Sequence, residues 1–281
     1  MTARILIIDG YTQAGRDQFK ENGASTAGEL YTRMLKRWSP QAIDTEILYP
    51  ADPGVELPGA SDLKSYAGIA WTGCSLCLCD DIEPVRKQIQ LGKACFESQV
   101  PSFGSCWATQ IACVSAGGKV LPNPKGREQG LARKITLTEA GRSHPMFEGK
   151  PPVFDAFTSH DDEVVDISPY GVNLASNHWS DVQAAEVAYL GGTFWSVQYH
   201  PEYDLHEMAR LVACRIPKLI RGGFFPDEKT AEAYIEDLEQ LHQDPSRRDI
   251  AWRLGIDSDV EDEAIRCVEV KNWLEKQVFG V

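Results

Sequence analysis

The chain has 281 residues, of which 43% are hydrophobic, and its 28 basic and 41 acidic residues give a formal net charge of −13. This acidity argues against a nucleic-acid partner, because binding to phosphates relies on basic patches. The sequence contains no run of about 20 apolar residues and enters a predicted strand at once, so we expect neither a membrane-spanning helix nor a signal peptide. We therefore predict a cytoplasmic protein whose eight cysteines are thiols.

Strand-like and helix-like runs alternate through the first part of the chain. The predicted strands are 5–9, 44–49 and 68–72, and the predicted helices are 29–38 and 82–91. This alternation is typical of a doubly wound α/β fold with a mostly parallel sheet. In such a fold, functional sites lie beyond the carboxyl ends of the strands.

Residues 10–28 connect the first strand to the first helix and are predicted to form a long loop. Loops of this length at the end of a strand often act as lids or select substrates. Arg16 and Asp17 are the notable side chains of this loop, because a guanidinium at position 16 would clamp a substrate carboxylate. The alternative, a solvated loop without such a role, stays open.

Cys106 lies between a predicted strand end at 100–103 and a predicted helix at 109–116. A strand that turns abruptly into a helix holds the residue at the turn in a strained, exposed position and requires small neighbours, here Gly104 and Ala108. The start of a helix favours a thiolate and lowers the pKa of a cysteine from its usual value of about 8.5. Cys106 is therefore the candidate nucleophile, and the alternative is a buried structural cysteine.

A nucleophile needs a base, and the segment that ends at His200 supplies one. Residues 193–199 are β-branched and aromatic, as is typical of a strand, and Pro201 keeps His200 extended at its carboxyl end. Two residues further on, Glu202 would accept a hydrogen bond from the imidazole and stabilise the imidazolium. After Val120, the segments 134–138, 154–158 and 172–175 are predicted to form an antiparallel excursion before this last strand.

Taken together, these motifs resemble the class I glutamine amidotransferases, whose signature is GxCxGxQ followed downstream by QxHPE. The chain reads GSCWATQ at 104–110 and QYHPE at 198–202. Two further landmarks agree with the family: FTSHDDEV at 157–164 is similar to its SHxDxV segment, and TGCS at 72–75 falls where the family has a glycine-rich loop. The resemblance covers about residues 3–220, and is closest to a stand-alone amidotransferase of the GMP synthase type.

The resemblance implies a flavodoxin-like fold and a set of functional residues. The implied catalytic triad is Cys106, His200 and Glu202. The backbone N–H groups of Gly73 and Trp107 are implied to form the oxyanion hole. The implied substrate-binding residues are Gln110, Ser159 and His160. Glutamine or a γ-glutamyl amide is the expected substrate.

Cys74, Cys77 and Cys79 have a CxxCxC spacing that is compatible with zinc. A fourth ligand at a recognisable spacing is missing, and the cluster coincides with the proposed oxyanion loop. We therefore predict neither a metal nor a cofactor.

A helical extension is predicted after Gly222, Gly223 and Pro226. Residues 227–281 contain 15 acidic and 7 basic residues, so this segment carries 7 − 15 = −8 of the net charge. Apolar stripes at helical spacing predict that it packs on the main domain. The sequence thus predicts a domain at 1–222 and an acidic helical extension at 223–281.

Three functions remain open at this stage. The leading hypothesis is an enzyme that cleaves the γ-carboxamide of glutamine through a cysteinyl thioester and works beside a separate, ammonia-accepting synthase. The second is a catabolic hydrolase of N-substituted γ-glutamyl amides that needs no partner. The third is a catalytically weak regulatory or binding subunit. The sequence leaves homo-oligomerisation undecided.

Overall fold

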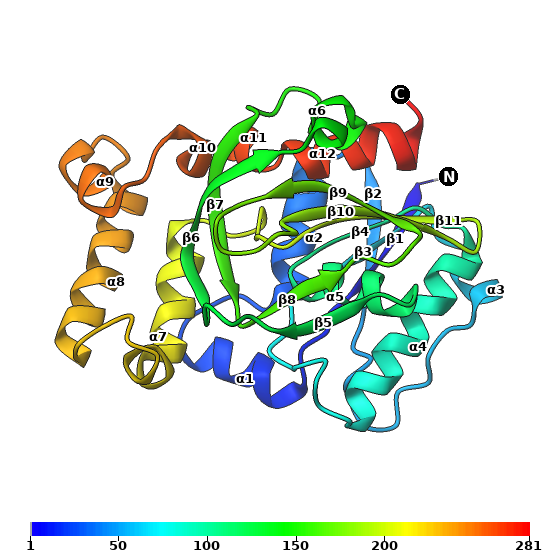
Figure 1. The fold of residues 1–281 in the computed structure, drawn as a ribbon, viewed down its shortest axis with the longest axis horizontal. Coiled ribbons are helices and arrows are strands. Elements are labelled where there is room, and N and C mark those ends of the chain that lie inside the picture. The colour runs from blue at the N-terminus through cyan, green and yellow to red at the C-terminus, as the bar shows by residue number, and fades with distance from the viewer. Residues whose placement is uncertain (1) are drawn as a thin grey trace.

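The structure, a computed structural model, describes residues 2–281 and contains a nine-stranded sheet (Figure 1). Five neighbouring strands pair in parallel, in the order β2 (Ile43–Leu48), β1 (Ala3–Ile8), β3 (Gly68–Trp71), β4 (Ser102–Ser105) and β11 (Gly192–Val197). Antiparallel strands continue the sheet, in the order β10 (Ala184–Tyr189), β9 (Gly171–Ser176), β6 (Glu128–Leu137) and β7 (Val153–His160). A two-stranded sheet pairs β5 (Lys119–Pro122) with β8 (Asp162–Asp166).

Helices connect and cover these strands. Those before the last strand are α1 (Gln13–Glu21), α2 (Ala27–Trp38), α3 (Ala60–Leu63), α4 (Glu83–Ser98), α5 (Trp107–Ser115) and α6 (Glu139–Ser143), followed by the 3-10 turn η1 (Pro145–Phe147). Those after it are α7 (Leu205–Arg221), α8 (Glu228–Gln243), α9 (Arg248–Leu254), α10 (Ser258–Glu261), α11 (Glu263–Arg266) and α12 (Val268–Trp273), which continues into the π-helical turn η2 (Leu274–Phe279). None of the helices in this described part of the chain is long and apolar enough to cross a membrane.

Apolar residues on both faces of the parallel strands explain the two helical layers. In β1, Ile5 and Ile7 pack in the cluster that contains residues of α2 and α12. Leu6 and Ile8 point to the opposite face, in the cluster with α4 and α5. Successive side chains of a strand point to opposite faces, so a strand that is apolar throughout must be covered on both sides. The predicted doubly wound α/β fold is confirmed.

The prediction of a long loop at 10–28 is wrong, because helix α1 occupies residues 13–21 and helix α2 begins at Ala27. Thr12 caps this helix, and Thr26 starts α2 with a reciprocal capping box to Glu29. Arg16 is buried, pairs with Asp52 at 2.6 Å and therefore does not point at a substrate.

Strand β10 was not predicted either. Its sequence, AAEVAY, contains three alanines, which have weak strand propensity. The strand forms because it lies between β9 and β11 and pairs with both. Tertiary pairing therefore overrides the local preference of this segment.

The C-terminal segment packs at two places. Helix α8 lies beside α7 at one end of the molecule and buries Ala231, Leu238 and Leu241 (Figure 1). Helix α12 packs on the sheet, where the ring of Trp273 lies 5.8 Å from that of Phe103. The division into 1–222 and 223–281 remains a proposal.

A buried polar cluster also joins α12 to the main body. The carboxylate of Glu269 lies 3.1 Å from the Lys150 ammonium and accepts a hydrogen bond from the Tyr199 hydroxyl. Burial of a charge is costly without a partner, and here each charged group has one. Since Tyr199 directly precedes His200, this cluster ties the C-terminal segment to the strand end that carries the candidate base.

Candidate active site

Cys106 lies at the turn between β4 and α5, at the position predicted for the nucleophile. Its φ of 54° and ψ of −100° are strained for a residue with a side chain, and its N–H donates to the carbonyl of Val197 at 2.7 Å. The turn is tight, because a Cβ on Gly104 would lie 2.3 Å from the Cβ of Ala108 and 2.4 Å from the Trp71 carbonyl oxygen. Residue 104 must therefore be a glycine, because a side chain there would collide with the methyl group of Ala108.

The prediction that Cys106 is exposed is wrong in its literal sense, since only 4% of the residue is accessible. The residue nevertheless lines a cavity of about 510 Å³, so the thiol is not sealed in the core. Trp107, Gln110, Ser159 and His160 line the same cavity. The burial arises because the end of β7 covers the elbow: the Ser159 carbonyl oxygen lies 3.9 Å from the Cys106 sulfur.

His200 and Glu202 form a buried pair next to Cys106. The imidazole Nδ1 lies 2.7 Å from Glu202 Oε1, and the ring stacks on Tyr203 with centroids 4.2 Å apart. The backbone N–H of His200 donates to the Phe157 carbonyl at 2.8 Å, which fixes the end of the strand. The three residues of the predicted triad thus converge from the β4–α5 turn and the segment after β11.

The charge state of His200 follows from its surroundings. Burial disfavours the imidazolium, but the Glu202 carboxylate and the Cys106 sulfur together outweigh it and raise the pKa of His200 to about 9. A protonated imidazole beside the sulfur is the partner that a thiolate nucleophile requires.

Two positioning residues were not found from the sequence. Ser105 donates a hydrogen bond to Glu202 Oε1 at 3.0 Å, and the Tyr31 hydroxyl donates to Ser105 at 2.6 Å. These contacts orient the carboxylate that holds His200. No local pattern identifies Tyr31, because it lies in α2, 74 residues before the Ser105 hydroxyl that it contacts.

The backbone amides of Gly73 and Trp107, the predicted oxyanion donors, lie next to Cys106. Neither N–H has an acceptor within hydrogen-bonding distance among residues 2–281. Trp107 directly follows Cys106, and Gly73 is so close to the imidazole that a Cβ there would lie 2.9 Å from His200 Cε1 and 3.7 Å from the Cys106 Cβ. The two donors remain proposed, on the basis of this geometry.

Gly73→Ala tests this arrangement. We expect kcat/KM to fall about 10²-fold, because the added methyl displaces the imidazole and shifts one oxyanion donor. Glutamate release from a γ-glutamyl amide is the measurement. Gly59→Ala is the matched control, since the nearest atom to its added Cβ lies at 3.6 Å. Full activity of Gly73→Ala would show that this loop is not part of the site.

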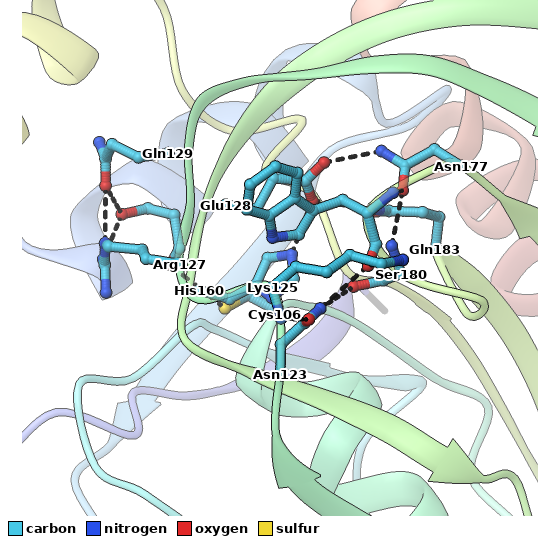
Figure 2. Close-up of polar contacts among 12 residues, drawn as sticks. Cys106, Asn123, Lys125, Arg127, Glu128, Gln129, His160, Asn177, Ser180 and Gln183 are labelled. Carbon is cyan, nitrogen blue, oxygen red and sulfur yellow. Dashed lines mark hydrogen bonds and ion pairs between the residues drawn. The ribbon is translucent and has the colours of Figure 1, made fainter. Parts of the chain in front are cut away.

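The three predicted substrate-binding residues line the cavity but are themselves engaged. Gln110 donates to the Asp162 carbonyl at 3.3 Å. His160 Nδ1 lies 2.9 Å from the same carbonyl, and its Nε2 lies 2.8 Å from Glu128 (Figure 2). These contacts link α5 and the end of β7, which carries Ser159, to the first residue of β8. Their contact with substrate stays a prediction.

His160 is held at this wall of the cavity by two oxygen partners, the Asp162 carbonyl and the Glu128 carboxylate. Glu128 accepts hydrogen bonds from Asn177 and Gln183 as well as from His160 (Figure 2). Burial raises the pKa of Glu128, but these hydrogen bonds outweigh it and lower the pKa below its usual value, so Glu128 is ionised. Both ring nitrogens of His160 therefore lie against oxygen atoms, which fixes the orientation of the ring.

The cysteine-rich loop differs from its prediction. Cys77 and Cys79 are joined by a disulfide, which corrects the expectation that every cysteine is a thiol, whereas Cys74 is free. Within residues 2–281, no group of three or more His, Cys, Asp or Glu side chains is arranged to hold a metal ion. The short spacing of a CxC pair gave no basis for predicting the bond.

Comparisons with known proteins identify the family of this chain. The glutamine amidotransferase class-I family matches residues 79–213. A γ-glutamyl-L-1-hydroxyisopropylamide hydrolase of Pseudomonas sp. is 32% identical over 98% of this chain and 93% of its own. A glutamine-hydrolysing GMP synthase of Thermomicrobium roseum is 33% identical over 61% of this chain and 31% of its own. The crystal structure of a glutamine amidotransferase from Thermotoga maritima superposes with a TM-score of 0.66 at 15% identity, covering 99% of each chain.

The chain belongs to the class-I glutamine amidotransferase family. It is a cysteine-dependent amidohydrolase with the mixed α/β fold of that family.

Proposed function

We propose that the chain hydrolyses N-substituted γ-glutamyl amides through a thioester on Cys106, releasing glutamate and an amine. The observation that carries this proposal is that Cys106, which lines the cavity with Trp107, lies beside the His200–Glu202 pair and the backbone of Gly73. The choice of a substituted amide is supported by the hydrolase of Pseudomonas sp., whose similarity extends over the C-terminal helices as well.

The proposed reaction has two halves. The Cys106 sulfur adds to the γ-carbonyl carbon, and the N–H groups of Gly73 and Trp107 hold the oxyanion. His200 gives its proton to the departing nitrogen, so that the C–N bond breaks and the amine leaves. Water then attacks the thioester while His200 accepts its proton, and the C–S bond breaks to give the glutamyl carboxyl group and the Cys106 thiolate beside the restored imidazolium. Glu202 stabilises the imidazolium in both halves.

The alternative is a glutaminase component that supplies ammonia to a separate synthase. The similarity to GMP synthase favours it, although that match spans only 61% of this chain. The two functions differ in substrate and in their need for a partner. The γ-glutamyl cleavage step is common to both.

A substrate panel separates the two. The purified chain is incubated with L-glutamine, L-γ-glutamyl ethylamide and γ-glutamyl-L-1-hydroxyisopropylamide, and glutamate release is measured without any partner protein. We expect kcat/KM for a substituted amide to exceed that for glutamine by about 10-fold or more, because the cavity also accommodates the amine. A preference for glutamine would instead support the synthase-linked function.

A further inference from the structure

Two guanidinium groups converge on one hydroxyl in the substrate cavity. Arg127, which precedes β6, and Arg215, from α7, each donate to Ser159 Oγ at 2.6 Å. The Ser159 hydroxyl in turn donates to Gln129 at 2.7 Å; Figure 2 shows Arg127 and Gln129 side by side. A hydroxyl has one proton and two lone pairs, so Ser159 has nothing left for a ligand. The two guanidinium groups, by contrast, keep further N–H donors that can bind a ligand.

The positive charge at this wall is only partly compensated. Arg127 and Lys218 share one carboxylate oxygen of Asp161, at 2.5 and 2.7 Å. No carboxylate lies within 4 Å of Arg215 among residues 2–281. Burial, followed by the positive charge of Arg215, lowers the pKa of Arg127. Two like charges held together in a cavity are stabilised when an anion enters between them.

This wall lies next to the nucleophile. The carbonyl oxygen of Ser159 is 3.9 Å from the Cys106 sulfur, and Arg127, Arg215 and Cys106 line the same cavity. A γ-glutamyl amide carries a carboxylate a few bonds from the carbon that Cys106 attacks. Guanidinium groups bind carboxylates through paired, charge-assisted hydrogen bonds.

We propose that Arg127 and Arg215 form a carboxylate-binding subsite of the substrate cavity, in which the Ser159 hydroxyl bridges the two guanidinium groups and holds them in place. The subsite deepens the proposed function and rests on it. Its ligand is a carboxylate of the substrate, either the α-carboxylate of the glutamyl group or a carboxylate on the leaving amine. The sequence predicted that Ser159 contacts the substrate. In this proposal, Arg127 and Arg215 make that contact instead, and Ser159 positions them.

Binding to Cys106→Ala protein tests the subsite without turnover. Three ligands are titrated by calorimetry: L-γ-glutamyl ethylamide, its α-carboxamide analogue, which has no carboxylate, and L-γ-glutamylglycine, which has two. Adding Arg215→Gln is expected to weaken binding of the ethylamide by about 10- to 100-fold and to leave the analogue within about 3-fold. Arg215→Lys keeps the charge and should recover part of the loss.

Arg221→Gln is the matched control, because Arg221 lines the same cavity from the exposed end of α7 and makes no hydrogen bond to Ser159. Loss of affinity for γ-glutamylglycine alone would support the subsite with the leaving amine as the source of the carboxylate. The proposal is overturned if Arg215→Gln weakens ligands with and without a carboxylate equally or weakens none, if Arg221→Gln acts as strongly, or if no ligand binds the Arg215-intact protein.

The subsite and the proposed function fail separately. Turnover of the same amides by protein with Cys106 intact decides the hydrolytic function. Lack of turnover together with carboxylate-dependent binding would reject the hydrolysis and keep the subsite. Turnover without carboxylate-dependent binding would keep the hydrolysis and reject the subsite.

Discussion

Replacement of Cys106 by alanine is expected to lower kcat/KM by about 10⁴-fold or more, because no other group in the cavity replaces the sulfur that forms the thioester. The free energy of unfolding should change by only about 1 kcal/mol, since the substitution removes one atom from a residue that borders a cavity. Glutamate release and urea denaturation measure the two effects.

Cys214→Ala is the matched control, since Cys214 lines the same cavity from α7. It should retain activity. Acid quenching during turnover, followed by mass spectrometry, should find the glutamyl group on the peptide that contains Cys106 and on no other. Activity in Cys106→Ala, or a glutamyl group on another cysteine, would reject the proposed mechanism.

The second large effect is expected for Glu202→Gln. Glutamine keeps the size of the side chain but removes the charge that opposes burial of the imidazolium, so the pKa of His200 should fall from about 9. We expect kcat/KM to fall by about 10³-fold. The alkaline limb of the pH–rate profile, near pH 9 in the original chain, should move to lower pH.

The same substitution changes how stability depends on pH. The pKa of His200 is about 9 in the folded chain and 6.5 in the reference state, so the imidazolium binds its proton more tightly when the chain is folded. This stabilisation is fully present below pH 6.5 and is lost as the pH rises through 9. We expect the free energy of unfolding, measured by urea denaturation, to be lower at about pH 9.5 than at about pH 6 in the original chain. In Glu202→Gln this decrease should be much smaller.

Glu236→Gln is the control for both measurements, because Glu236 is exposed on α8 and lies outside the cavity. It should change neither the pH–rate profile nor the pH dependence of stability. If Glu202→Gln left the alkaline limb in place, that limb would belong to another group and the assignment to His200 would fail.

The fold class could be predicted because it depends on local patterns. Runs such as ILII in β1 are apolar on both faces, and this alone indicates a covered, parallel strand. The elbow around Cys106 and the HPE segment at 200–202 were also predictable, because each is a short stretch whose backbone restrictions follow from its own residues. The loop predicted at 10–28 is wrong because the side chains of Thr12 and Thr26 cap helices there, and capping depends on single residues rather than on a periodic pattern.

What the sequence by itself determined is therefore the chemistry of the centre: a cysteine at a tight turn and a histidine and a glutamate at a strand end. Only the tertiary structure decided how these residues are supported and what surrounds them. Tyr31 and Ser105 meet Glu202 across the sheet, and Arg127 and Arg215 meet at Ser159 from distant elements. The physical reason is that hydrogen bonds and charges act over a few ångströms in space, and only folding sets which groups, far apart along the chain, come within that range.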